Sequence, residues 1–67
     1  MKKQYRIVFE TGGYFPEERM FFMWFRLKTD IDGYNIERYF DSYRQALGFI
    51  SVYNKQYHGD REYRIVM

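Results

Sequence analysis

Few side chains in this sequence have the chemistry of a catalytic group. His58 is the only histidine and cysteine is absent, so nucleophilic catalysis would require Ser42 or Ser51 to meet His58 as its base. Ser42 has the pattern of a helix cap, and Ser51 falls within the helix that follows. Glu17 and Glu18 would need a buried pocket that shifts a pKa before they could act as an acid/base pair. One sheet with one helix has little room for such a pocket, so we predict that the chain is not an enzyme.

The segment Asp30-Ile31-Asp32-Gly33 is similar to the start of a calcium-binding loop. Such a loop needs further oxygen ligands on schedule and a bidentate Glu at its twelfth position. Counted from Asp30, that position is Asp41. His58 has no other histidine or cysteine at ligand spacing, so it does not indicate a metal either. The segment therefore predicts a tight turn, and we expect no metal and no cofactor.

The composition indicates one small domain, residues 1–67, with an aromatic core. The 67 residues include 8 Tyr, 7 Phe and 1 Trp, and each ring can bury on the order of 150–250 Å². Such rings compensate for the missing disulfides in a chain that is too short for two cores. The 11 basic and 9 acidic residues interleave, and the net charge of +2 does not by itself indicate nucleic acid as the partner.

The chain has no apolar run near the roughly 20 residues that a membrane span requires. Its first residues, Met1-Lys2-Lys3-Gln4-Tyr5, lack the apolar region and small-residue cleavage site of a signal peptide. The absence of cysteine also fits a reducing compartment. We therefore expect a soluble cytoplasmic protein that does not act at a membrane.

Hydrophobic periodicity predicts one helix and four strands. The strands are expected over residues 4–10, 20–29, 34–40 and 61–67. Residues 11–19 contain Gly12-Gly13 and Pro16, so they are predicted to form a long connecting loop. Ser42 and Gln45 form a capping-box pattern, and this predicts a helix over residues 42 to about 57, stopped near Gly59.

These elements predict an α+β fold with a single four-stranded sheet in the element order β-β-β-α-β. If the first three strands form an antiparallel meander, the last strand runs parallel to the first and the strand order is 3-2-1-4. One helix can cover only one face of such a sheet. In the strand over residues 20–29 one face ends in Arg26 and Lys28, so the opposite face is assigned to the core. The predicted core residues of this strand are Phe21, Met23, Phe25 and Leu27.

The sheet face that the helix leaves open is the predicted binding surface. Aromatic residues beside arginine are typical of binding hot spots, and contiguous exposed apolar patches mark interaction sites. An alternative is that the loop over residues 11–19 folds across this face as a lid. The apolar residues expected on the face are Val8, Phe22, Trp24, Tyr39 and Val66, with Glu37 among the charged residues at its rim. The predicted partner-binding residues are Arg6, Tyr14, Phe15, Phe22, Trp24, Arg26, Tyr39 and Arg64.

Three kinds of partner fit this surface. A protein partner is the leading hypothesis, and an exposed strand edge could also accept a strand from it. A single-stranded nucleic acid could stack its bases on the rings and place its phosphates beside the cations. No Lys/Arg-Gly-Phe-type RNA-recognition segment is present, however. A second copy of the chain would produce a homodimer through the same face.

Two stretches resemble small uncharacterised proteins encoded by bacteriophages. They are Met20-Phe21-Phe22-Met23-Trp24-Phe25 and, after a polar turn and a short strand, Tyr39-Phe40-Asp41-Ser42-Tyr43-Arg44-Gln45-Ala46. The resemblance covers residues 4–57 and brings no catalytic motif with it. It implies the cytoplasm of a bacterial host and an accessory role, such as blocking a host or defence protein. The slightly basic charge differs from that of an acidic DNA mimic.

Overall fold

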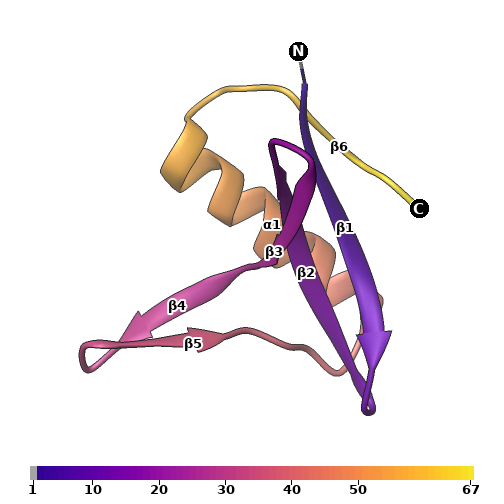
Figure 1. Cartoon of the computed structure of the whole chain (residues 1–67), viewed down its shortest axis with the longest axis vertical. Helices are drawn as coiled ribbons and strands as arrows, with labels where there is room; N and C mark the ends of the chain where they lie inside the picture. Colours follow the sequence, from indigo (N-terminus) through magenta and orange to yellow (C-terminus); the bar gives the residue numbers. More distant parts are fainter. Residues whose placement is uncertain (1) are drawn as a thin grey trace.

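The structure, a computed structural model that describes residues 2–67, contains one helix and two sheets. In chain order the elements are β1 (Lys3–Glu10), β2 (Gly13–Met20), β3 (Met23–Arg26), β4 (Lys28–Ile31), β5 (Tyr34–Glu37), α1 (Tyr43–His58) and β6 (Tyr63–Ile65). Four strands form the main sheet in the order β3-β2-β1-β6, and β4 pairs only with β5. Figure 1 shows α1 behind the main sheet and the β4–β5 hairpin extending to one side. We call this hairpin the wing.

The α+β class and the strand order of the main sheet are confirmed. The last strand lies parallel to the first, with Tyr5 opposite Ile65, as the crossover through the helix requires. The helix begins where the capping pattern predicts, because the Ser42 hydroxyl accepts a hydrogen bond from the Gln45 backbone N–H at 3.1 Å. It ends before Gly59, whose φ of 64° lies in the left-handed region that favours glycine.

The second strand of the sheet is not the predicted one. Residues 11–19 are not a long loop, since only Thr11 and Gly12 form a turn and β2 follows at once beside β1. Both turn residues have positive φ, 50° and 77°. This is the geometry of a two-residue hairpin turn whose twist matches antiparallel strands. Because β2 is part of the sheet, the alternative of a lid over the open face is also wrong.

Pro16 lies inside β2, a position that proline seldom occupies because it has no N–H for the ladder. On its outer side, β2 pairs with β3 only from Glu17 to Met20. Before Pro16 the partner changes, and Tyr14 exchanges backbone hydrogen bonds of 2.9 and 3.0 Å with Phe40. Pro16 therefore stands where β3 leaves the sheet, and the missing N–H has no strand to pair with.

The predicted strand over residues 20–29 is divided into two. The chain turns at Phe21 and Phe22, forms the edge strand β3, and then bends at Leu27 into β4. Leu27 is 1% exposed, and its N–H donates to the Pro16 carbonyl at 3.0 Å. The predicted strand over residues 34–40 ends at Glu37 and pairs with β4, outside the main sheet. The interruption at residues 21–22 moves the following side chains to an edge.

This division determines which of the predicted core residues are buried. Leu27 is buried as expected, whereas Phe21, Met23 and Phe25 are 90%, 61% and 45% exposed, so their assignment to the core is wrong. The centre of the core is instead Tyr5 of β1 and Ile50 of α1, together with Leu27. The partly buried residues packed around them are Ile7, Phe49, Tyr53, Tyr63 and Ile65.

A buried polar chain links the helix to two strands. The Tyr5 hydroxyl donates to Asn54 Oδ1 at 2.9 Å, and Asn54 Nδ2 donates to the Arg61 carbonyl at 2.8 Å. Asn54 is only 3% exposed, so both of these hydrogen bonds satisfy groups that are shielded from water. The Tyr5 ring also meets Tyr53 and Tyr63 edge to face at 6.4 and 5.6 Å. These contacts attach α1 and the chain before β6 to β1.

The buried Tyr5 hydroxyl leads us to expect that the protein loses stability at alkaline pH. Burial, with a smaller contribution from Glu18, raises the pKa of Tyr5 above its ordinary value. Folding therefore favours the protonated phenol, so this stabilisation is complete below the unfolded pKa of about 10 and is lost as pH rises above it. We expect the urea midpoint to be steady near neutral pH and to fall above about pH 10.

The matched variant for this prediction is Tyr5→Phe. It leaves Asn54 Oδ1 without its donor, so at neutral pH it should be less stable by about 1–3 kcal/mol. Its stability should then fall less steeply with pH than that of the parent protein, because the Tyr5 hydroxyl is gone. Some alkaline loss should remain, because burial also raises the pKa of Tyr53. Parallel pH profiles for the two proteins would show that the Tyr5 hydroxyl has no part in the alkaline loss.

Candidate binding surfaces

The sheet face opposite α1 brings together most of the predicted partner-binding residues. Strand alternation and register place Arg6 of β1, Phe15 of β2 and Trp24 and Arg26 of β3 on this face. Arg64 lies next to Gln4 on the same face, and Tyr39 packs on Phe15 with ring centroids 5.6 Å apart. The expected open face therefore exists and carries six of the eight predicted residues: Arg6, Phe15, Trp24, Arg26, Tyr39 and Arg64.

Glu17 is the centre of the charge arrangement on this face. Its carboxylate is 9% exposed and accepts from Arg6 Nε at 2.7 Å and from Arg26 Nε at 3.3 Å. Arg26 also donates to Glu10 at 2.7 Å and to Glu37 at 3.4 Å. The hydrogen bond with Glu10, and then that with Glu17, raises the pKa of Arg26 above its ordinary value, against the opposing effect of burial. Two of the predicted binding cations are thus already paired with carboxylates.

The same arginines cover the aromatic rings. The Arg6 guanidinium lies 4.5 Å from the Trp24 ring centre, and that of Arg26 lies 4.0 Å from the Phe15 ring centre. Gly13 allows Tyr39 to lie against the sheet, since a Cβ at Gly13 would come within 2.9 Å of Tyr39 Cδ2. The predicted bare aromatic patch is therefore not present here. We call this arrangement the arginine–glutamate lattice; it consists of Arg6, Glu10, Glu17, Arg26 and Glu37.

Two predicted residues lie away from the open face. Tyr14 points to the helix side, where its ring meets Phe9 at 4.8 Å and Tyr43 at 6.2 Å. Strand alternation places Tyr14 there, because the preceding residue in β2, Gly13, is on the open face beside Tyr39. Phe22 belongs to the turn between β2 and β3 and so lies at the end of the hairpin. The prediction that Phe22 shares the face with Trp24 is wrong, and Tyr14, predicted to bind the partner, lies on the opposite side of the sheet.

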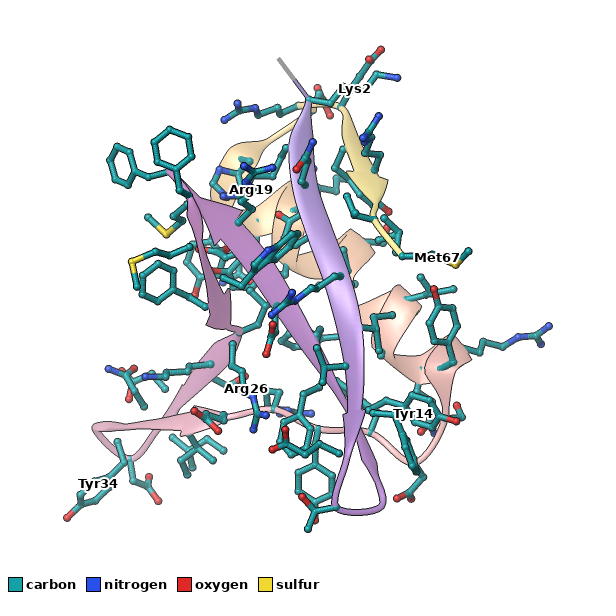
Figure 2. The ribbon with its side chains drawn as sticks, turned by 45° about the vertical axis from the view of Figure 1, so that its right-hand side comes forward. Lys2, Tyr14, Arg19, Arg26, Tyr34 and Met67 are labelled. Atoms are coloured by element: carbon teal, nitrogen blue, oxygen red, sulfur yellow. The ribbon has the colours of Figure 1, made fainter. Side chains whose placement is uncertain are left out.

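The turn between β2 and β3 carries the two most exposed aromatic side chains among the described residues 2–67. Phe21 and Phe22 are each 90% exposed, and the flanking Met20 and Met23 are 42% and 61% exposed. We call residues 20–23 the aromatic tip. Phe25, 45% exposed, extends this apolar surface along β3. In Figure 2, Arg19 lies close to this end of the hairpin and Arg26 lies near the opposite end of β3.

The backbone of the tip is strained as well as exposed. Phe21 has a φ of 59°, whereas Phe22 is not among the residues with positive φ. A two-residue hairpin turn with positive φ at its first position favours glycine there. For a residue with a side chain the left-handed conformation costs roughly 1–2 kcal/mol. Sequence reasoning missed this turn because neither residue is a turn former, and the only signal was the run of large apolar residues.

Positive charge surrounds the tip. A pocket of about 550 Å³ beside Phe21 and Phe22 is lined by four cations, Lys2, Lys3, Arg19 and Arg61, and by no carboxylate. Lys3 Nζ donates to the Arg19 carbonyl at 3.1 Å. Lys2 also lies 3.8 Å from a Glu62 carboxylate oxygen, outside this lining. The tip therefore combines two bare phenylalanine rings with a cationic border.

The fold and these surfaces define the class of protein as a small α+β domain with a sheet, one covering helix and a protruding aromatic turn. Comparison with family models, curated proteins and solved structures found no match for the chain. Within residues 2–67, no three side chains of the metal-binding types come together. No helix in that part of the chain has the length and apolar character to cross a membrane.

Proposed function

We propose that this protein is a non-catalytic binding module that docks on another protein through its aromatic tip. The observation that carries this proposal is the state of Phe21 and Phe22, both 90% exposed, with Phe21 at a φ of 59°. Neither feature stabilises the fold, since rings that stay exposed contribute almost no burial and the backbone at Phe21 is strained. A chain selected only for stability would have glycine or asparagine in this turn.

The surroundings of the tip indicate the chemistry of the partner. Two adjacent rings can each bury enough surface to act as anchors, as aromatic residues do at binding hot spots. The cations beside them, among them the exposed Arg19, favour a border of negative charge on the other protein. The partner that fits is a protein with an apolar cavity edged by aspartate or glutamate.

A single-stranded nucleic acid is the second candidate for the same site. Four cations and two exposed rings without a carboxylate are a combination that can hold phosphates and stack bases. It ranks second because Arg6 and Arg26, two of the cations that were predicted to hold phosphates at the open face, are paired with glutamates. A symmetric dimer through the tip would bring the same four cations together, which disfavours self-association there.

The cellular role follows from the resemblance to bacteriophage-encoded proteins and belongs to the same proposal. In the cytoplasm of a bacterial host, a module of this size could block an enzyme or a defence protein by filling an apolar cavity with its tip. Such inhibition needs no catalytic group, and the domain contributes only a rigid hairpin and its border of charge.

The test is affinity capture from a bacterial lysate with three immobilised proteins. They are the parent protein, the tip variant Phe21→Gly/Phe22→Asn, and the matched control Tyr34→Asn, which removes an exposed ring next to the turn of the wing. We expect one protein to be captured by the parent and by the control and lost with the tip variant. With that protein purified, the tip variant should bind at least about 100-fold more weakly. Equal capture by all three proteins would exclude the tip.

The alternatives have their own readouts. Fluorescence anisotropy with labelled oligothymidylate measures nucleic-acid binding, and an affinity that falls steeply with salt and is lost in the tip variant would place nucleic acid first. Light scattering during gel filtration measures the mass in solution. A dimer that the tip variant converts to a monomer would show that the tip binds a second copy.

A further inference from the structure

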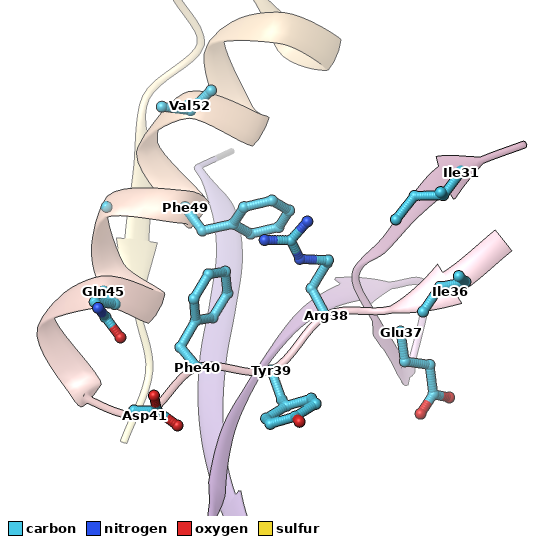
Figure 3. A pocket seen from close by; sticks show the side chains of 11 residues that line it. Ile31, Ile36, Glu37, Arg38, Tyr39, Phe40, Asp41, Gln45, Phe49 and Val52 are labelled. Carbon is cyan, nitrogen blue, oxygen red and sulfur yellow. The ribbon is translucent and has the colours of Figure 1, made fainter.

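A groove of about 770 Å³ separates the wing from α1. Ile31 and Ile36 of the wing form one wall, and Phe49 and Val52 of the helix form the other, with Arg38 between them (Figure 3). The two isoleucines are 44% and 45% exposed, and Val52 is 64% exposed. A two-stranded hairpin is marginally stable in water by itself. The wing therefore presents an apolar face that the rest of the chain does not cover.

Glu37 and Asp41 also line this groove, but neither forms an ion pair with Arg38. Its guanidinium lies 5.3 Å from the Phe40 ring centre and 5.4 Å from that of Phe49. Among residues 2–67 it forms no ion pair, whereas Arg26 pairs with three glutamates. No side-chain hydrogen bond restrains its N–H groups within the described part of the chain either. The rings hold a planar group whose five donors match a carboxylate.

Gly48 is a second, independent feature of the groove. It lies in the middle of α1, where glycine is less stable than alanine by roughly 0.5–1 kcal/mol. A Cβ at Gly48 would meet nothing within 4 Å, so no contact inside the protein requires its small size. Gly48 lines the groove, and the missing side chain lets the main chain of a ligand approach the helix closely.

We infer that this groove binds an extended apolar segment of a partner protein, with an aspartate or glutamate of that segment paired to Arg38. The apolar walls accept side chains, and the guanidinium selects the carboxylate. Each strand of the wing pairs on one side only, so its outer backbone groups can form hydrogen bonds with a peptide. A lipid chain has no groups that could form these hydrogen bonds. The aromatic tip of a second copy does not fit, because its cationic border would meet Arg38.

The experiment is a selection of random heptapeptides displayed on phage, with the parent protein as target and Gly48→Phe as counter-target. Phenylalanine at this position fills the groove from the helix side. The matched control is Ser51→Phe, on an exposed position of the same helix that does not line the groove. We expect enriched peptides in which an acidic residue is flanked by apolar ones.

A synthetic copy of the enriched peptide then gives the affinities. Binding should fall at least about tenfold with Arg38→Gln and with Gly48→Phe, and stay unchanged with Ser51→Phe. Arg38→Lys keeps the charge without the planar fork, so an intermediate loss is expected. Circular dichroism of each variant establishes that the fold is retained. The tip variant Phe21→Gly/Phe22→Asn should bind the peptide normally, so this site and the proposed function fail or succeed separately.

Four results would overturn the inference. They are the absence of any enriched peptide, a consensus without an acid, equal binding to the parent and to Arg38→Gln, and peptide binding that Gly48→Phe does not weaken. Sodium octanoate serves as a further probe. If octanoate displaces the peptide at equal affinity, the groove is a site for a lipid acid. If light scattering finds a dimer that Gly48→Phe dissociates, the occupant is a second copy.

Discussion

Glu17→Gln is expected to lower the free energy of unfolding by about 2–3 kcal/mol, a large part of the stability of a domain this small. The Glu17 carboxylate is 9% exposed and accepts from both Arg6 and Arg26. An amide of the same shape can accept from one arginine only and presents its NH₂ group to the other. Two guanidinium groups would then share the face without the charge between them.

The matched control is Glu37→Gln. Glu37 is 49% exposed and pairs with Arg26 at 3.4 Å, so its neutralisation should cost less than about 1 kcal/mol. Urea unfolding followed by the fluorescence of Trp24, the only tryptophan, measures both variants. Trp24 stacks on Arg6, so loosening of the arginine–glutamate lattice should also change its native emission. Equal losses in the two variants would show that burial of Glu17 adds nothing.

The tip variant Phe21→Gly/Phe22→Asn is expected to be more stable than the parent protein, while it loses its partner. Glycine relieves the strain at a φ of 59°, which costs roughly 1–2 kcal/mol for a residue with a side chain. Part of this gain is lost to the greater freedom of glycine in the unfolded chain. We expect a net gain of about 1 kcal/mol, which raises the melting temperature by roughly 4–8 °C.

The variant Phe21→Ala separates the effect of the backbone strain on stability from the effect of the exposed ring. Alanine removes the exposed ring and keeps a side chain in the left-handed conformation, so its stability should stay within about 0.5 kcal/mol of the parent. Differential scanning calorimetry compares the three proteins. A lower melting temperature for the tip variant would mean that the rings pack on the domain. A higher one, with loss of capture, would show that the turn is retained for binding at the expense of stability.

The sequence alone was sufficient where the determinants are local. Ser42 and Gln45 lie three residues apart on one chain, and their capping contact forms in the helix as the pattern predicts. The alternation in residues 4–10 and 61–67 and the intervening helix predicted that these two strands are parallel neighbours in the sheet. The set of residues on one face of β1 and β3 also followed from period two, which is why Arg6, Trp24 and Arg26 were placed together.

The tertiary structure decided where the strands begin and end. Gly12 and Pro16 are loop formers by composition, yet the former completes a hairpin turn and the latter lies where β3 leaves the sheet. Phe21 and Phe22 have the composition of a strand and form a turn. Local propensity is worth about 1 kcal/mol per residue, so pairing along a whole strand overrides it.

The arginine–glutamate lattice and the aromatic tip also depend on where the strands begin and end. The sequence contains the arginines, glutamates and rings, and it determines which side chains alternate along a strand. Only the register between strands places Glu17 between Arg6 and Arg26, closing the predicted surface, and only the turn at residues 21–22 exposes the tip. Register joins residues that are distant in the chain, and a one-residue shift would reverse every face. Pairing such distant residues costs loop-closure entropy, and only the contacts of the whole fold offset it. A short sequence pattern therefore cannot predict the register.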